Sequence, residues 1–457
     1  MTSVDKPSVV IAGAGLAGLA AGTWLQELGH SVQIVEAAER PGGRALTIER
    51  PDGSGDRADV GTQYFHTNYR RALALIEAAG LTHELRRVRG RTWFFDQRAP
   101  GGTFTTGHRL PYIRAAGFLA NLSLLLGGLV RMLRNPIDPF ALSDRWERID
   151  AQSVSDAIKN PWEREFTART LITAGALAET EPVAQSSGDD FYNNFSYLHL
   201  IRLMRIVLMT DYLALDGGVA ALHAALAARL HVTYEAEAKS ILWDGRARGL
   251  EMADGSHCLA EHVILAVPPD AAAETLPDEW AEERGFLNSV RQPPALVVTF
   301  WLDGPHEEGI WSYVFPPDKG SPSACKDRIV SFCTDAAQKN PRMVPSGRAA
   351  LQAWICWPAS ARAMKMDDED LVAAVKAELE EHFPGLPGRT EAVHVQRHAK
   401  AVPQIPPGHA REARRFLDRM DRREGLEICG DFLSGGYMEC ALWSAERSTR
   451  RINDQLA

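Results

Sequence analysis

The stretch that decides the fold occupies residues 9–44 and reads VVIAGAGLAGLAAGTWLQELGHSVQIVEAAERPGGR. It passes from a short apolar run through a glycine-rich turn into a helix-forming segment, and then into a second apolar run that ends at Glu36. This pattern predicts a strand over residues 8–12, a helix over residues 16–28 and a strand over residues 31–35. Strand, helix and strand in this order form the βαβ unit of a parallel sheet, so the expected fold class is α/β.

The turn inside this unit has the G-x-G-x-x-G spacing, with Gly13, Gly15 and Gly18. The first glycine allows a tight turn, the second lets the backbone approach a pyrophosphate, and the third lets the helix pack closely on the strand. The helix N-terminus then faces the phosphate charge. Glu36 stands at the end of the second strand, where an acid can bind ribose hydroxyls. The motif alone is a weak signal, but this context predicts a dinucleotide-binding unit.

A second motif, ERPGGR at residues 39–44, follows the acid directly. A plain NAD-binding unit does not require it. Gly42 and Gly43 allow a sharp backbone path, and Arg44 offers the forked donor that pairs with phosphates.

With this motif, residues 9–44 resemble the N-terminal FAD fingerprint of the flavin-containing amine oxidase superfamily. That superfamily includes monoamine oxidases, protoporphyrinogen oxidases and phytoene desaturase-like enzymes. DVGTQYF at residues 59–65 resembles its next flavin-contacting loop, and DGG at residues 216–218 resembles the turn that re-enters the FAD domain. GD at residues 430–431 and GYMECA at residues 436–441 resemble the segment that closes over the flavin.

The resemblance covers roughly half of the chain and implies non-covalent FAD in a discontinuous Rossmann-type domain, with a parallel sheet and a three-stranded meander. The implied cofactor-binding residues are Gly13, Ala14, Gly15, Leu16, Ala17, Gly18, Glu36, Ala37, Gly43, Arg44, Gly61, Thr62, Gln63, Tyr64, Ala238, Ala266, Val267, Gly430, Asp431, Gly436, Tyr437, Met438 and Ala441. The candidate catalytic residues on the substrate side are Tyr437, Tyr64 and Trp357. For Tyr64 a packed or solvent-facing role is an open alternative, and for Trp357 packing in the core is.

The nucleotide-binding signals lie at both ends and in the middle of the chain, so the domains are expected to be discontinuous. The expected FAD-binding domain takes residues 1–99, 216–290 and 395–457. An α+β substrate-binding domain takes residues 100–215, which look helical, and residues 291–394, where strands at 295–302, 328–334 and 351–356 suggest a second sheet. Three short strands are expected at residues 232–235, 239–244 and 249–252, with Asp-Gly turns at residues 244–245 and 254–255.

Departures from the family pattern bear on the substrate. Tyr437 matches one of the two aromatic residues that flank the flavin in amine oxidases, but Ala401 stands where the other is expected. Lys400 stands where some members attach the flavin through cysteine, and residues 294–298 lack the lysine that many amine oxidases place near the flavin.

The run at residues 401–409 instead resembles protoporphyrinogen oxidases. We therefore expect an enzyme that abstracts a hydride from a C–H bond of a bulky apolar or heterocyclic substrate, with O2 or a quinone as electron acceptor. The alternatives are an amine or amino-acid oxidase, which makes an imine and hydrogen peroxide, and a non-catalytic flavin-binding scaffold.

Composition and charge limit the partners and the cellular compartment that we expect. The 457 residues carry a net charge of -9, which argues against a nucleic-acid partner. The six cysteines are scattered and none has metal-ligand spacing, so we expect no metal and a reduced, cytoplasmic setting. An uncharged run over residues 115–130 precedes Arg131 and Arg134 and is either a buried helix or a peripheral membrane patch at residues 115–134. No signal for an oligomeric state is visible.

Overall fold

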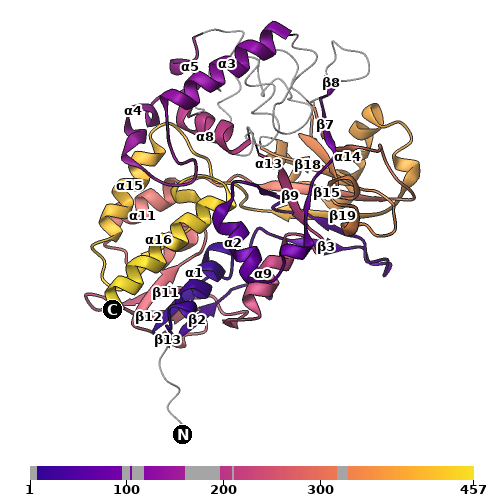
Figure 1. Cartoon of the computed structure of the whole chain (residues 1–457). Coiled ribbons are helices and arrows are strands. Elements are labelled where there is room, and N and C mark those ends of the chain that lie inside the picture. The colour runs from indigo at the N-terminus through magenta and orange to yellow at the C-terminus, as the bar shows by residue number, and fades with distance from the viewer. Residues whose placement is uncertain are drawn as a thin grey trace.

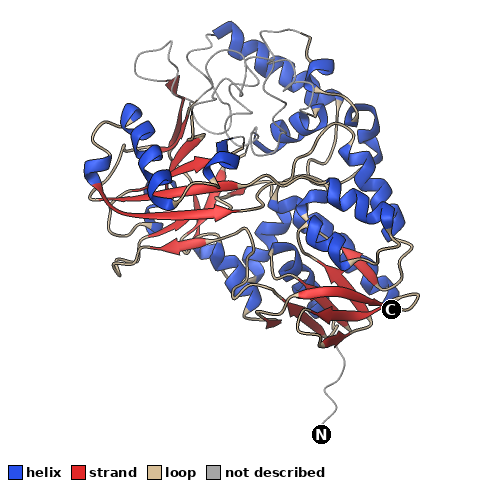
Figure 2. Ribbon diagram, turned by 180° about the vertical axis from the view of Figure 1, so that it is seen from behind, coloured by secondary structure: helices blue, strands red, loops and turns tan. Residues whose placement is uncertain are grey.

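The computed structural model describes residues 8–94, 103–104, 118–159, 196–207, 210–315, 328–357 and 359–456 (Figure 1). Two sheets organise these residues, a parallel one near the N-terminus of the chain and a larger mixed one beside it. Figure 2 shows the two sheets from behind, with helices packed around both. The α/β fold class with a parallel sheet, a meander and a second sheet is confirmed.

The parallel sheet has five strands in the order β10-β2-β1-β14-β20. Strand β1 lies at its centre, with Val9 opposite Val32 of β2 and His262 of β14. All four residues of β1 are buried, as expected for a strand covered on both faces. The bounds are β1 (Val9–Ala12), β2 (Val32–Val35), β10 (His231–Thr233), β14 (His262–Leu265) and β20 (Leu426–Ile428).

The two faces of β1 enter different cores because successive side chains point to opposite sides. Val9 and Ile11 pack against the helices α1 (Leu16–Glu27), α2 (Arg70–Ala78), α9 (Ala220–Ala227) and α16 (Met438–Leu456). Val10 and Ala12 pack toward the meander and the helices α10 (Pro269–Thr275), α11 (Ala281–Ser289) and α15 (His409–Met420). Helix α16, from the far end of the sequence, thus lies against α1.

The meander contains three antiparallel strands, and two of them match the strands expected at residues 239–244 and 249–252. Its strands are β11 (Ala238–Trp243), β12 (Ala247–Met252) and β13 (His257–Leu259). The expected strand at residues 232–235 is β10, which joins the parallel sheet beside β2. The physical reason is that the two Asp-Gly turns each close a hairpin, so they separate the strands before, between and after them.

The second sheet has seven strands in the order β19-β15-β18-β17-β16-β7-β8, antiparallel except where β16 runs parallel to β7. Helix α14 (Asp368–His382) covers one face, where Leu371, Val375 and Leu379 share a core with residues of β15. The bounds are β7 (Arg91–Phe94), β8 (Thr103–Phe104), β15 (Ala295–Leu302), β16 (Ile310–Val314), β17 (Phe332–Asp335), β18 (Ala350–Ile355) and β19 (Thr390–His398).

Two of these strands bear on the expected domain limits. Strand β7 falls within residues 1–99 yet pairs with β16, and β19 runs across the limit between residues 394 and 395. The division into two domains stays a prediction, with β7 belonging by its pairing to the second sheet.

Smaller elements connect the two sheets. Short strands form the pair β3 (Thr47–Glu49) and β4 (Arg57–Asp59) and the group β5 (Phe65–His66), β6 (Leu85–Arg87) and β9 (Tyr212–Leu215). Short helices are α12 (Ala336–Lys339), α13 (Ala359–Ala363), η1 (Thr82–Glu84), η7 (Pro341–Met343), η8 (Pro387–Arg389) and η9 (Asp431–Leu433).

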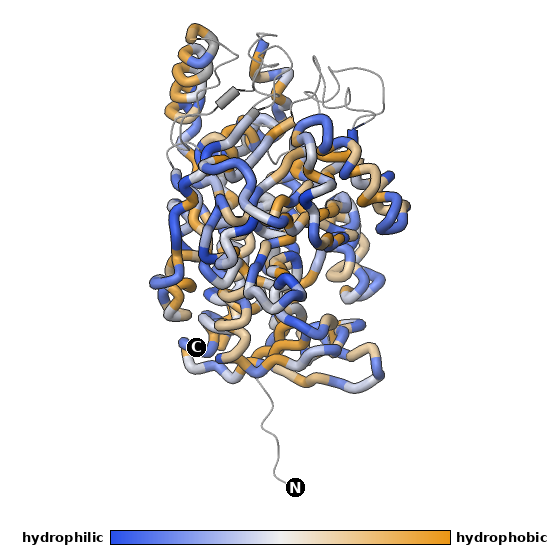
Figure 3. The backbone as a smooth tube through the Cα atoms, turned by 90° about the vertical axis from the view of Figure 1, so that its right-hand side faces the viewer, coloured by the Kyte–Doolittle hydropathy of each residue, from blue (hydrophilic) through white to orange (hydrophobic). Residues whose placement is uncertain are grey.

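The described part of residues 100–215 is largely helical. It holds α3 (Phe118–Arg134), η3 (Asp144–Trp146), α4 (Glu147–Asp150), α5 (Val154–Ala157) and α8 (Tyr197–Val207). These helices share a small core around Trp146, Leu198 and Ile201. Helix α3 lies at the top of the molecule in Figure 1, and the uppermost helix in Figure 3 is coloured mostly as hydrophobic.

Candidate flavin site

The three glycines of the first turn are required for different reasons. Gly13 has φ +102°, and a Cβ there would lie 2.5 Å from the carbonyl oxygen of Ala266. A Cβ at Gly18 would lie 2.0 Å from the carbonyl oxygen of Gly13. A Cβ at Gly15 would meet no atom within 4 Å. The fold therefore excludes side chains at Gly13 and Gly18, whereas Gly15 leaves open space at the N-terminus of α1, which suits a pyrophosphate.

Glu36 lies directly after β2, beside this turn. Its carboxylate accepts the backbone N–H of Ala14 at 2.6 Å and that of Ala38 at 2.9 Å. These bonds fix the half-buried carboxylate next to the glycine turn, and each oxygen keeps a lone pair for a ribose hydroxyl. Ala37 is exposed beside it.

Arg44 joins segments from opposite ends of the sequence. Its guanidinium donates to the carbonyl oxygen of Ala401 at 2.7 Å and forms a two-oxygen ion pair with Asp431, with both N–O distances 2.8 Å. Its side chain is 41% exposed, so part of the fork remains open for a phosphate. Gly43 beside it is exposed and has φ +54°, a conformation that favours glycine.

The loop over residues 61–64 is held against the backbone at Arg44. A Cβ at Gly61 would lie 1.9 Å from the carbonyl oxygen of Arg44, and the N–H of Thr62 donates to the same oxygen at 3.3 Å. Tyr64 ends the loop in an aromatic cluster, with its ring 4.4 Å from that of Tyr212. Gly61, Thr62, Gln63 and Tyr64 are all half-buried.

The C-terminal segment approaches from the other side. Asp431 is buried, whereas Gly436, Tyr437, Met438 and Ala441 at the start of α16 are half-buried. The ring of Tyr437 stacks on that of His199 from α8 with centroids 5.9 Å apart. Helix α16 packs along α1 in the same direction, because Asn453 in its last turns lies 3.0 Å from the ring of His30 just after α1, so its N-terminal end points toward the glycine turn.

The structure thus brings together several predicted residues and places others apart. Gly13 contacts Ala266 and Val267, and Arg44 contacts Asp431 and the backbone beside Gly61. Ala238 begins β11, and Ala236 nearby donates its N–H to the carbonyl oxygen of Glu36. Among the remaining expected residues, Ala14 lies in the glycine turn, Leu16 and Ala17 begin α1, and Met438 begins α16. Gly430 lies between β20 and η9.

Trp357 follows β18 and is half-buried. Among the described residues its indole N–H has no hydrogen-bond partner. Its assignment to the substrate side stays a prediction.

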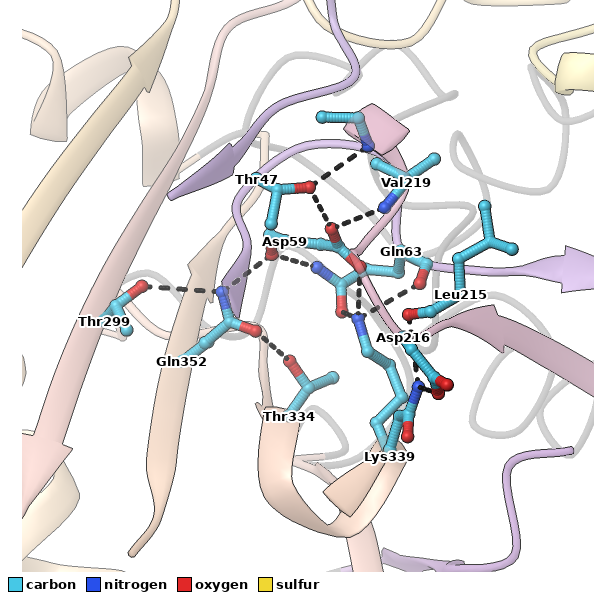
Figure 4. A network of polar contacts seen from close by, with 12 residues as sticks. Thr47, Asp59, Gln63, Leu215, Asp216, Val219, Thr299, Thr334, Lys339 and Gln352 are labelled. Carbon is cyan, nitrogen blue, oxygen red and sulfur yellow. Dashed lines mark hydrogen bonds and ion pairs between the residues drawn. The ribbon is translucent and has the colours of Figure 1, made fainter. Parts of the chain in front are cut away.

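A buried ion pair between α12 and β4 was not predicted from the sequence. The Nζ atom of Lys339 lies 2.7 Å from a carboxylate oxygen of Asp59 (Figure 4). The two side chains are 0% and 2% exposed. Lys339 stands in an ordinary polar stretch, and only the folded chain shows that its partner lies 280 residues earlier.

Arg202 of α8 is a second residue that was not predicted from the sequence. Its side chain is fully buried, its guanidinium lies 3.9 Å from the Trp146 ring centroid, and no hydrogen-bond partner exists for it among the described residues. One of its nitrogens would touch a Cβ at Gly435, next to the start of α16. Burial lowers the pKa of Arg202.

The described residues contain neither a metal site nor a helix that could span a membrane. No group of three or more His, Cys, Asp or Glu side chains there has a geometry that could hold a metal ion. No helix among those residues has both the length and the apolar character needed to cross a membrane.

The model of the family described as flavin containing amine oxidoreductase matches residues 16–453. The chain belongs to this family. The match confirms the expected family, its flavin cofactor and the oxidoreductase class.

Curated relatives match over parts of the chain. The flavin-dependent L-tryptophan oxidase RebO of Lentzea aerocolonigenes is 32% identical over 172 residues, which are 37% of this chain and 33% of that protein. Lysine-specific histone demethylase 1 homolog 1 of Arabidopsis thaliana is 47% identical over 60 residues, 13% of this chain and 7% of that protein. The chain therefore spans a third or less of the length of these relatives.

Solved structures match along the whole chain at low identity. A protein assigned as a protoporphyrinogen oxidase from Exiguobacterium sp. 255-15 has a TM-score of 0.71 and 21% identity, covering 98% of both chains. Cyclohexylamine oxidase from Brevibacterium oxydans IH-35A has a TM-score of 0.72 and 20% identity, covering 99% of both chains. These likenesses show the fold.

Proposed function

We propose that this chain is an FAD-dependent oxidoreductase that abstracts a hydride from a C–H bond of a bulky apolar or heterocyclic substrate. The observation that carries the proposal is the pairing of Arg44 with Asp431 and the carbonyl of Ala401, because it joins the predicted cofactor-binding segments from both ends of the chain. A Cβ at Gly15 would meet no atom within 4 Å, and Tyr437 is half-buried just before α16.

The residues present fit non-covalent FAD. Gly15 and Arg44 would hold the pyrophosphate, and Glu36 the ribose. The N-terminus of α16 and the loop at residues 61–64 would hold the flavin ring. Lys400, rather than cysteine, occupies the position of covalent attachment in some relatives and forms an ion pair with Asp270.

When bound, FAD supplies the hydride acceptor. The substrate loses a hydride and a proton, and O2 or a quinone takes up two electrons and two protons to give hydrogen peroxide or quinol. The chain's own residues bind and orient the substrate and exclude water, with Tyr64 and Tyr437 as side chains that face it. No protein base is required for hydride abstraction, which agrees with the absence of a sharp acid–base constellation in the sequence.

Support for an apolar or heterocyclic substrate comes from Ala401. It offers no aromatic ring at the position where amine oxidases carry one, and its carbonyl is engaged by Arg44. Residues 294–298, which include the start of the fully buried strand β15, lack the lysine that many amine oxidases place near the flavin.

A second candidate, an amine or amino-acid oxidase, is favoured by Tyr437 and Arg202. A buried charge without a partner is costly, so an anion such as a substrate carboxylate would complete the Arg202 environment. The curated relatives include L-amino-acid oxidases, which is compatible with this candidate. A third candidate, a non-catalytic flavin-binding scaffold, predicts that only dithionite reduces the flavin.

The test is anaerobic reduction of the flavin-loaded protein. We expect a yellow protein that lipophilic heterocycles bleach and that amines and amino acids do not. Bleaching by amines with imine and peroxide release would support the second candidate. In that case Arg202→Met should impair amino acids more than simple amines. A colourless protein that cannot be loaded with FAD would contradict all three.

We further propose that α3 contacts the membrane surface peripherally. Its outer face exposes a row of apolar side chains: Phe118, Leu119, Leu122, Leu125, Leu126, Leu129, Val130 and Leu133. Arg131 and Arg134 at its C-terminal end suit anionic headgroups. Its inner face is anchored, because Arg205 donates to the carbonyl oxygens of Met132 and Asn135.

Sedimentation with vesicles tests this contact. We expect binding to vesicles rich in anionic phospholipid and less binding after Leu126→Ser with Leu133→Ser. Leu28→Ser with Leu259→Ser is the matched control, since these leucines are also exposed but lie elsewhere. Equal binding by both double variants, or none by the wild type, would contradict the contact and favour a cytoplasmic protein free of membranes.

A further inference from the structure

The short helix α12 and the residue after it have buried charged and polar side chains, which lie between the second sheet and the loop at residues 61–64. Lys339 ends this helix with a fully buried side chain, and Asn340 follows it and is almost fully buried. Burial of an ammonium group is tolerated only when it is paired and hydrogen-bonded. The partners of Lys339 therefore indicate what the lysine holds.

All three partner atoms belong to the flavin loop and the strand before it. The Nζ atom donates to the carboxylate of Asp59 at 2.7 Å, to the backbone carbonyl oxygen of Gln63 at 3.1 Å and to the side-chain oxygen of Gln63 at 3.3 Å (Figure 4). These three bonds use the full donor capacity of an ammonium group. They fix both ends of the segment from Asp59 to Gln63.

Asp59 is held from the other side by the cofactor-side elements. Its second carboxylate oxygen accepts the hydroxyl of Thr47 at 2.7 Å and the backbone N–H of Val219 at 2.9 Å. Val219 lies just after the Gly217–Gly218 turn that begins α9. The carboxylate thus links Lys339 to the turn that re-enters the parallel-sheet region.

A neutral contact from β18 supports the same segment. Gln352 donates its side-chain N–H to the backbone carbonyl oxygen of Asp59 at 2.8 Å. Its side-chain oxygen accepts the hydroxyl of Thr334 at 3.4 Å. Asn340 adds a bond from its side-chain N–H to the carbonyl oxygen of Leu215 at 3.1 Å. The second sheet therefore holds the cofactor-side loops through side chains.

We propose that Lys339 is a positioning residue for the flavin: through Asp59 and Gln63 it fixes the loop at residues 61–64 in the conformation that receives the isoalloxazine ring. The inference rests on the proposed FAD site. Lys339 is fully buried and its three hydrogen bonds go to Asp59 and Gln63, so it acts through Gln63 and the backbone rather than by contact with the ring. Because Gly61 touches the carbonyl of Arg44, a displaced loop also disturbs the phosphate-binding arginine.

The test compares Lys339→Met, Asp59→Asn and the double variant with the wild type. Either single change leaves one member of the buried pair without its partner, which is more disruptive than removing both. We expect each single variant to bind FAD at least tenfold more weakly and to show altered fine structure in the visible flavin band. The double variant should regain part of both. Lys239→Met is the matched control, because Lys239 forms an exposed ion pair with Glu251 at 3.0 Å.

A merely structural role would lower the thermal stability of the apoprotein and leave the affinity and spectrum of the folded fraction unchanged; that result would overturn the proposal. If Lys339→Met does not fold, Gln352→Leu provides the same measurement, since it removes the neutral contact to Asp59, together with the longer ones to Thr334 and Thr299, and keeps the buried ion pair. A wild-type protein that does not bind FAD would instead overturn the proposed function.

Discussion

The two sheet regions contribute to the candidate flavin site in different ways. The parallel-sheet region contributes backbone: glycines at positions where a Cβ would collide, and helix N-termini that present N–H groups. The region of the seven-stranded sheet contributes buried side chains, above all Gln352 of β18 and Lys339 of α12, which hold a loop that neither sheet contains. Backbone features leave a compact motif in the sequence, whereas side-chain bridges join residues that are far apart. We expect changes in the parallel-sheet region to alter the fold or the cofactor site directly. Changes in the region of the seven-stranded sheet should act on the site through the loop at residues 61–64.

The largest effect is expected at Gly18. A Cβ there would lie 2.0 Å from a backbone oxygen, which cannot move without displacing β1. Gly18→Ala should lower the free energy of unfolding by about 3 kcal/mol or more, the upper range for overpacked sites. Urea unfolding of the apoprotein measures this. The control is Gly285→Ala in α11, where a Cβ meets nothing within 4 Å and stability should not fall.

A smaller effect is expected at Arg44, which contributes its side chain to the candidate flavin site. Arg44→Met removes the bonds to Asp431 and Ala401 and leaves a buried carboxylate without its partner. Hydrogen bonds to charged groups contribute about 1.5–3 kcal/mol. FAD affinity should therefore fall by roughly tenfold to a hundredfold. Fluorescence titration measures it, and unchanged affinity would remove Arg44 from the site.

Gly15→Ala separates the fold from the ligand. Its φ of -72° suits alanine and its Cβ would meet no protein atom, so the apoprotein should unfold at the wild-type urea concentration. The added methyl group obstructs the approach of a phosphate, so FAD affinity should fall by about tenfold, or ~1.4 kcal/mol. A variant that loses stability, or that binds FAD normally, would contradict the assignment of this space to the pyrophosphate.

In the region of the seven-stranded sheet, we expect Asp335 to make the stability of the protein depend on pH. Burial raises the pKa of Asp335, the N-cap of α12, to about 7 from its ordinary value of 3.8. Between these values the folded protein holds a proton that the unfolded chain has lost, so stability from this group is present at low pH and lost as pH rises to about 7. Asp335→Asn should remove this fall, whose slope is at most about 1.4 kcal/mol per pH unit. Urea midpoints from pH 4.5 to 8 measure it; parallel curves for both proteins would show that Asp335 titrates normally.

The sequence predicted the parts of the site that depend on local geometry. Gly13 and Gly18 stand where strand and helix touch, and this constraint shows in the spacing alone. The same reasoning misplaced the strand at residues 232–235, because chain order does not reveal that β10 pairs with β2. It also could not find Lys339, since an isolated lysine in a polar stretch is ordinary until the fold places it against Asp59. Only contacts across long separations, which depend on the packing of both sheets, distinguish it.

The most direct test of the account is the crystal structure of the flavin-loaded protein. We predict the pyrophosphate within hydrogen-bond distance of the Gly15 backbone and the Arg44 guanidinium, with the isoalloxazine ring between the loop at residues 61–64 and Tyr437. A ring that lies remote from Tyr437, or a cofactor bound away from the glycine turn, would contradict it.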